Sequence, residues 1–472
     1  MSPTALAFVC AFVAGLVLAF VRHPRYGLYT YIAVFYIHPP SRWWGSFAPE
    51  MRWALIASIV TLIATWRLKD DGQRPTWLKT TPARILLLMT AWIWIQNAWA
   101  LDSAEHLDLS VVFTKYVMLF YLIYRLVDTP REAVNFLLVH VLGCFYLGWL
   151  AFNAPVSGRL EGVGGPGINE ANAFAMQMAT AIVIGAMMVL SSRGARRWVA
   201  FASMPLLLNS IVLAGSRGAF VAILCAGLVL AMLKPHADRK LFYGLAGLAV
   251  VLFGMLAHDY FWERMSSMKA AAQDDTADMD NSALSRIVMF EAQLRMARSH
   301  PLGTGHRGTA VLSPAYLDER FLLKDPDHPD LPGQRSSHNT FMTALVEQGI
   351  PGLLMFTAIW VWCIVEVVRV RRLRAIRDNS EDAAMLAGVA GALMVVFVAG
   401  MFVDYFKAEV QIWLLAALAS IGTIARRATA QSSGATPVGL GDMPRYGRER
   451  LETAVRGLPE YGSPHSGRQQ NQ

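Results

Sequence analysis

The chain contains 472 residues, of which 55% are hydrophobic and only 16% are charged, and its formal net charge is +8. A mean hydropathy of +0.38 excludes an ordinary soluble globular protein, which needs more charged surface at this length. In a membrane protein, a positive net charge indicates basic cytoplasmic loops rather than binding to nucleic acid.

Apolar runs recur along the whole chain, and most approach the roughly 20 residues that cross a bilayer. They predict an all-α polytopic membrane protein with about 12 or 13 transmembrane helices, because the second run is short and follows Pro24. The first run lacks a basic stretch before it and a small-residue cleavage site after it, which argues against a cleaved signal peptide. The runs are centred on Ala5–Phe20, Tyr26–Ile37, Trp53–Trp66, Ile85–Ala100, Val111–Val127, Ala133–Phe152, Ala171–Leu190, Trp198–Ala214, Ala219–Leu233, Leu241–Ala257, Ile350–Val368, Ala383–Phe402 and Val410–Ala425.

Basic residues concentrate in alternate loops between these runs. If every run spans the membrane, these loops lie on one face, which the positive-inside rule assigns to the cytoplasm. The opposite loops, including the long segment 259–338, are then expected to face the periplasm. The basic positions include Arg22, Arg25, Arg67, Lys79, Arg84, Arg125, Arg131, Arg193, Arg196, Arg197, Lys234, Arg369, Arg371, Arg372, Arg374, Arg377, Arg426 and Arg427.

The same patterns divide the chain into four parts. We expect transmembrane helices over 1–258, a periplasmic loop over 259–338, further transmembrane helices over 339–425 and a disordered cytoplasmic tail over 426–472. Within the loop, Leu284–Ser299 is predicted as an amphipathic helix, capped by Asn281 or Ser282 and ended by Pro301 and Gly303. Its shared apolar face comprises Ile287, Phe290, Leu294 and Ala297.

Four residues at the predicted outer face are candidates for chemistry. His338 lies where the long loop re-enters the membrane, and a histidine can act as a general base near pH 7. Arg159, Arg217 and Arg286 carry guanidinium groups, whose rigid fork of donors fits phosphate oxygens. Each also has an ordinary structural alternative, as a packed histidine, a snorkelling arginine or a solvated arginine. Together the four predict a site that holds a diphosphate and activates a hydroxyl.

We expect no metal and no cofactor in this site. Asp274 and Asp275, with Asp278 and Asp280, imitate an acidic metal-binding pair, but they lie in a polar stretch of the long loop. The four cysteines fall inside apolar runs and show neither metal-ligand spacing nor a disulfide framework.

An ordered set of short motifs resembles the O-antigen ligase and polymerase superfamily. The resemblance covers roughly residues 150–370, and the Gly158–Asn172 segment looks like the outer segment of that family. The N-terminal segments His23–Gly27, His38-Pro39-Pro40 and Trp44-Gly45 are similar to a branch of O-glycosylation ligases associated with exosortase systems, although Pro39-Pro40 departs from the pattern of that branch. The superfamily motifs are Gly215-Ser216-Arg217-Gly218, Ser285-Arg286, Pro301-Leu302-Gly303-Thr304-Gly305, Ser337-His338-Asn339-Thr340 and Glu347-Gln348-Gly349-Ile350-Pro351-Gly352.

The resemblance implies a bacterial inner-membrane glycosyltransferase. It implies transfer of a glycan from an undecaprenyl-diphosphate carrier to a hydroxyl of lipid A-core or of a protein, with inversion and without a metal. Arg217, Arg286 and Arg159 would bind the diphosphate, and His338 would activate or orient the acceptor hydroxyl. The positions expected to shape the donor site are Asn169, Asn172, Gly303 and Gly305.

Two other functions remain open at this stage. A polymerase of the same superfamily would use a second lipid-linked glycan as acceptor, and nothing local in the sequence separates it from a ligase. A transporter or flippase would carry charged groups inside its spans, for which Lys115 and Glu170 are the few candidates.

Overall fold

The computed structural model describes residues 2–68, 74–155, 159–233, 281–323 and 333–432, with scattered positions between 240 and 254. In this part of the chain every element is helical, apart from one isolated bridge between Leu323 and Gln334. Most of the predicted run Leu241–Ala257, the acidic start of the long loop and the predicted tail after Ser432 lie outside the described residues.

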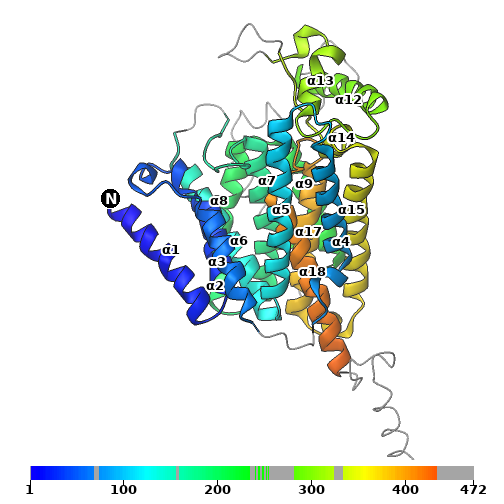
Figure 1. The fold of residues 1–472 in the computed structure, drawn as a ribbon. Coiled ribbons are helices and arrows are strands. Elements are labelled where there is room, and N and C mark those ends of the chain that lie inside the picture. Colours follow the sequence, from blue (N-terminus) through cyan, green and yellow to red (C-terminus); the bar gives the residue numbers. More distant parts are fainter. Residues whose placement is uncertain are drawn as a thin grey trace, which may run out of the picture. The chain divides into compact units, whose positions relative to one another are not determined.

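The all-α membrane architecture is confirmed. Among the described residues, eight helices are long and apolar enough to cross a membrane, and two shorter apolar helices, Trp53–Trp66 and Arg217–Leu233, accompany them. Every predicted run other than Leu241–Ala257 coincides with a helix (Figure 1). These helices are α1 (Pro3–Val21), α2 (Arg25–Ile37), α3 (Trp53–Trp66), α4 (Thr81–Gln96), α5 (Ser103–Leu126), α6 (Pro130–Asn153), α7 (Ala171–Ser191), α8 (Ala195–Ala214), α9 (Arg217–Leu233), α15 (Gly349–Arg371), α17 (Ser380–Ala399) and α18 (Glu409–Ser432).

The chain divides into a compact unit of residues 1–426 and a second unit of residues 427–472, and the following description concerns the first. Its centre is α7, which is apolar on all sides and buried over most of its length, as a helix surrounded by other helices must be. Glycines on α17 let the two helices approach closely, since a Cβ at Gly391 would lie 2.6 Å from Val183.

Three helices cover one end of the bundle: the 19-residue α12 (Asn281–Ser299) and the short helices α13 (Gly308–Tyr316) and α14 (Thr340–Glu347) (Figure 1). The predicted amphipathic helix is therefore present, although it begins at Asn281 rather than at Leu284. The side that packs differs from the predicted apolar face. Met289, Ala292 and Met296 are buried, whereas Ile287 and Phe290 remain exposed.

The loops at the two ends of the bundle are held by different kinds of contact. At one end, basic residues of neighbouring loops bond to adjacent helices. At the other end, the loops bond to one another, including the loop that follows α4, the α17–α18 loop and the segment before α14. The basic-end contacts include Arg25–Glu132, Arg196–Asn135 and Arg371–Met232, and those at the other end include Leu101–Thr304 and Thr340–Gly400.

Candidate active site

Asn172 ties the glycine-rich segment after α6 to the α8–α9 turn. Its Oδ1 accepts hydrogen bonds from a guanidinium nitrogen of Arg159 and from the hydroxyl of Ser216 (2.9 Å). The Nε of Arg159 also donates to the backbone carbonyl of Ala214 at 3.0 Å. These bonds fix the position of the half-buried Arg159 beside the turn from which α9 begins.

Arg217 is the first residue of α9, and two local features fix the conformation of the turn before it. Gly215 ends α8 with a φ of +56°, a left-handed conformation that glycine adopts without steric cost. The hydroxyl of Ser216 accepts from the backbone N–H of Ala219 at 3.4 Å and so caps the new helix. The guanidinium of Arg217 and the positive end of the helix dipole therefore act at the same place, which favours an anion.

His338 lies in the segment before α14, and hydrogen bonds hold this segment against α12. The side-chain amide of Gln293 donates to Ser337 Oγ at 2.8 Å, and Arg335 donates to Ser285 Oγ at 3.1 Å. Both bonds are made by residues just before His338 in sequence, Arg335 and Ser337. They place it over α12, the helix that carries Arg286 near its start.

Asn339 fixes the same segment on the C-terminal side of His338. Its Oδ1 accepts from the backbone N–H groups of Phe341 (2.9 Å) and Met342 (3.1 Å), which makes it the N-cap of α14. Its Nδ2 donates to the carbonyl of Met401 in the α17–α18 loop at 3.2 Å. The backbone on both sides of His338 is thus fixed by hydrogen bonds.

The surroundings of His338 keep its imidazole neutral. Burial, and to a smaller extent the positive charges of Arg335 and Arg286, lower its pKa from the ordinary 6.5 to about 4. At neutral pH the ring therefore has a lone pair that can accept a proton. Arg286, one of the arginines predicted to bind phosphate, is thus close enough to His338 for its charge to act on the imidazole.

Tyr405, which the sequence patterns did not single out, connects the two halves of the site. Its hydroxyl donates to the carbonyl of Asn172 at 2.6 Å, and its backbone N–H donates to Thr340 Oγ1 at 2.8 Å. In the same loop, Phe402 packs against Gly218, where a Cβ would lie 3.2 Å from it. The short loop between α17 and α18 thus contacts Asn172, which binds Arg159, as well as the start of α9 and the first residue of α14, just after His338.

The remaining predicted site positions have architectural roles. Asn169 Oδ1 accepts from the backbone N–H of Gly165 at 2.5 Å and closes a turn within the glycine-rich segment. Gly303 (φ +85°) and Gly305 (φ +80°) are packed so closely that a Cβ would lie about 2.5 Å from neighbouring atoms, among them Gly349 N. These residues shape the scaffold around the site rather than its polar lining.

Gly303→Ala is expected to destabilise the protein strongly. The added methyl would meet the backbone of Gly349 at 2.5 Å in a left-handed conformation, and such strain typically costs about 1–3 kcal/mol before any backbone shift. Thermal unfolding in detergent would measure the loss as a lower Tm. Gly227→Ala is the matched control, because a Cβ on that helical glycine of α9 meets no atom within 4 Å. An unchanged Tm for Gly303→Ala would contradict the packing described above.

A second polar network, also missed from the sequence, lies under the 300–308 segment. The Nδ1–H of His306 donates to Glu347 Oε2 at 3.0 Å, and its Nε2 accepts from Lys407 Nζ at 2.8 Å. The backbone N–H of His306 donates to His106 at 2.8 Å. Burial, followed by the negative charge of Glu347, raises the pKa of the adjacent Asp404 to about 6. The network joins α5, the end of α14 and the α17–α18 loop with alternating charges.

The N-terminal motifs lie at the same end and support the glycine-rich segment. Arg42 donates to the carbonyl of Ile37 at 2.6 Å and to that of Val163 at 3.1 Å. Gly165 lies so close to His38 that a Cβ would be 3.2 Å from it. Their contact with the site is therefore indirect, through the backbone of the segment that carries Arg159.

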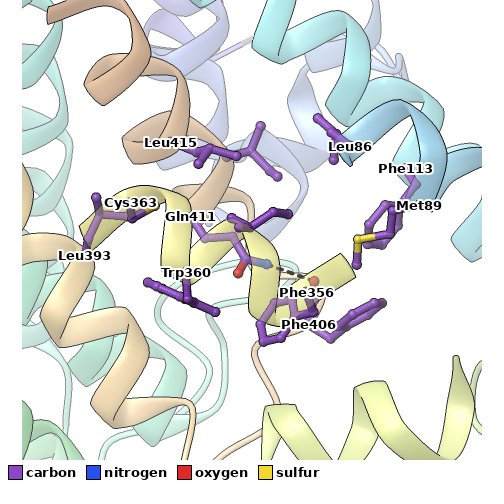
Figure 2. Close-up of a pocket in the computed structure, with 12 residues that line it drawn as sticks. Leu86, Met89, Phe113, Phe356, Trp360, Cys363, Leu393, Phe406, Gln411 and Leu415 are labelled. Carbon is purple, nitrogen blue, oxygen red and sulfur yellow. Dashed lines mark hydrogen bonds between the residues drawn. The ribbon is translucent and has the colours of Figure 1, made fainter. Parts of the chain in front are cut away.

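An apolar cavity lies beneath the α17–α18 loop (Figure 2). Its polar contribution comes from Gln411, whose Nε2 donates to the carbonyls of Tyr405 (3.0 Å) and Phe406 (2.9 Å). The cavity volume of about 30 Å³ leaves room for one or two water molecules, since a water needs roughly 10–15 Å³ of such space. This cavity is too small for a polyprenyl chain.

The charges considered for a transporter do not form a buried pathway. Lys115 is exposed on α5, and Glu170 precedes α7, where it accepts a hydrogen bond from Asn172 at 2.7 Å. In the described part of the chain, no group of three or more His, Cys, Asp or Glu residues is arranged to hold a metal ion.

Comparison with known proteins assigns the region that carries most of this geometry. Residues 202–357 match the O-antigen ligase family, an enzyme family, and the match includes Arg217, Arg286, Gly303, Gly305 and His338. Arg159, Asn172 and Tyr405 lie outside the matched residues. A search of curated proteins gives no match. The family match confirms the resemblance seen in the motifs, and over residues 202–357 the chain is similar to the O-antigen ligase family.

Proposed function

We propose that this protein is a glycosyltransferase of the bacterial inner membrane with its active site facing the periplasm. It takes a glycan from an undecaprenyl-diphosphate carrier and transfers it to a hydroxyl of lipid A-core or of a protein. The arginines hold the diphosphate, and His338 receives the proton of the acceptor hydroxyl. The observation that supports this proposal best is the neutral imidazole of His338 beside the cationic Arg286 and Arg335.

The reaction follows from these charges. The acceptor oxygen attacks the anomeric carbon while the bond from that carbon to the diphosphate oxygen breaks, which inverts the configuration. The acceptor proton passes to Nε2 or Nδ1 of His338, whichever faces the hydroxyl. Negative charge grows on the leaving diphosphate, and guanidinium groups placed in advance stabilise it. Arg217 acts from the start of α9 and Arg286 from α12, so the diphosphate would bridge the bundle and its cap.

Transfer by the purified full-length protein tests the proposal. The assay would contain an undecaprenyl-diphosphate glycan, lipid A-core or a protein acceptor, and EDTA. A product that carries one glycan on the acceptor, with the anomeric configuration inverted, supports the ligase. Products that grow on the carrier itself would instead identify a polymerase. Movement of the lipid-linked glycan across a vesicle membrane without transfer would overturn the proposal in favour of a flippase.

The acid limb of the pH profile should report the neutral histidine. Titration of His338 should leave kcat/KM unchanged from about pH 8 down to pH 5. Below that, kcat/KM should fall as the pH passes the pKa of about 4, because protonation of His338 removes the base. Arg335→Gln removes one positive charge, so the pKa should rise toward 6.5 and the limb should move to higher pH. Arg320→Gln is the control, since that arginine is exposed. A limb that stays in place or moves to lower pH in Arg335→Gln would contradict the assignment.

A further inference from the structure

A basic cavity lies at the end of the bundle opposite the candidate active site. Its volume is about 430 Å³, within the range of ligand pockets of roughly 300–1,000 Å³. Three of its lining residues are arginines, Arg371, Arg372 and Arg377, and the other two are apolar, Leu233 and Val368. Such a lining combines a strong preference for anions with walls suited to hydrocarbon.

The local fold brings the three arginines to the same cavity. Arg371 donates to the carbonyl of Met232 at 2.9 Å and joins the end of α15 to the end of α9. The chain then turns through α16 (Arg374–Arg377), whose Ile376 is buried in the core and holds the turn against the bundle. Arg377 is thereby brought back to the same cavity as Arg371. Its Nε donates to Asp378 at 3.3 Å, so one acidic group accompanies three basic ones.

Two exposed apolar stripes lead along the helices to this cavity. On α15 the stripe comprises Val361, Ile364 and Val368, which follow one another at helical spacing. On α9 it comprises Leu224, Leu228 and Met232, and Leu233 follows at the cavity itself. A hydrocarbon chain that lies along either stripe therefore ends beside the arginines.

We propose that this cavity binds the phosphodiester headgroup of an anionic phospholipid, with its acyl chains along α9 and α15. Guanidinium forks suit phosphate oxygens, and basic pockets between helices at the basic side of a membrane protein are suited to anionic headgroups. A zwitterionic lipid would bring a positive amine into a space already lined by three cations, so it should bind less well. The site is separate from the proposed transfer reaction and does not depend on it.

Native mass spectrometry of the full-length protein in detergent would test the site with phosphatidylglycerol and phosphatidylethanolamine as probes. We expect phosphatidylglycerol to be retained preferentially by the wild type. Arg371→Gln, Arg372→Gln and Arg377→Gln together should weaken its retention about tenfold or more, given the usual contribution of each basic residue near an anionic surface. The double variant Arg372→Gln with Arg377→Gln keeps the bond from Arg371 to Met232, so it remains informative if the triple variant fails to fold.

The control removes the same charge elsewhere at the basic end. Arg22, Arg131 and Arg193 are exposed and do not line the cavity, so their joint replacement by glutamine should leave retention of phosphatidylglycerol nearly unchanged. Equal losses in the control and the cavity variants would overturn the proposal, because the attraction would then be general. Displacement of phosphatidylglycerol by millimolar inorganic phosphate would also overturn it, since the cavity would then recognise free phosphate rather than a lipid.

Discussion

Replacing His338 by alanine is expected to lower kcat for glycan transfer by about 10²- to 10⁴-fold, the usual contribution of a positioned general base. The imidazole is unprotonated at pH 7 because burial and two neighbouring arginines oppose its protonation, so its lone pair is available to the acceptor hydroxyl, whose proton it takes as the hydroxyl oxygen attacks. Hydrogen bonds to α12 fix the backbone before His338, and Asn339 fixes the backbone after it. The measurement is transfer by the purified protein at saturating donor, with thermal unfolding to show that the variant is folded.

His300→Ala is the matched control for this prediction. His300 belongs to the same capping region, at the end of α12, and its Nδ1 lies 3.2 Å from the carbonyl of Met296 within the same helix. It should keep nearly full activity. His338→Gln further separates the roles of the ring, because an amide can orient a hydroxyl but cannot serve as the base. If His338→Ala, correctly folded, transferred glycan at the wild-type rate, the base would have to be another group.

The parts of the fold that depend on local composition could be predicted from the sequence. Apolar length and basic loops specify helices and their ends, and α15 and α17 closely follow the predicted runs. The amphipathic loop helix was also predictable, since its spacing and the stop at Pro301 and Gly303 are local signals. Which side of that helix packs was not, because Met289 and Met296 are buried only where α12 meets α13 and α14.

The candidate site was predictable in its individual residues but not in its connections. Arg217 and His338 stand out because a cation and a histidine at the predicted outer end require an explanation. Tyr405 gave no such signal, since an aromatic residue beside a membrane helix is commonplace. Its importance arises from a fold that brings Asn172 and Thr340 to its two ends. The same holds for His306 and Lys407, whose 2.8 Å contact joins residues far apart in the sequence.

These connections explain how a site built from separate helices keeps its geometry. The α17–α18 loop contacts the segment with Arg159, the start of α9 and the segment before α14, so movement of any one would strain the others. Rigid support of this kind is what a site needs when its arginines must be in place before charge develops. The ionic network of His306, Glu347 and Lys407 adds a further tie between the cap and the bundle.

Arg217→Ala and Arg286→Ala are each expected to lower kcat/KM by about 10²- to 10³-fold, the loss usually seen when one group that stabilises a developing charge is removed. Arg217 works together with the positive end of α9, and Arg286 lies on α12 beside His338. Lysine at either position keeps the charge but loses the planar fork, so Arg→Lys should recover only part of the activity. Steady-state transfer at several donor concentrations measures the effect.

Inhibition by undecaprenyl diphosphate, the leaving group, separates a role in diphosphate binding from a general disturbance of the fold. We expect the product to inhibit both alanine variants more weakly than the wild type. Arg320→Ala, whose side chain is 74% exposed in the same cap, should behave as the wild type does. Arg159→Ala should differ from both, because its bonds to Ala214 and Asn172 support the turn before α9, so its loss of activity should come with a lower Tm. Product inhibition that remains at wild-type strength in Arg217→Ala and Arg286→Ala would mean that the diphosphate is held by other residues.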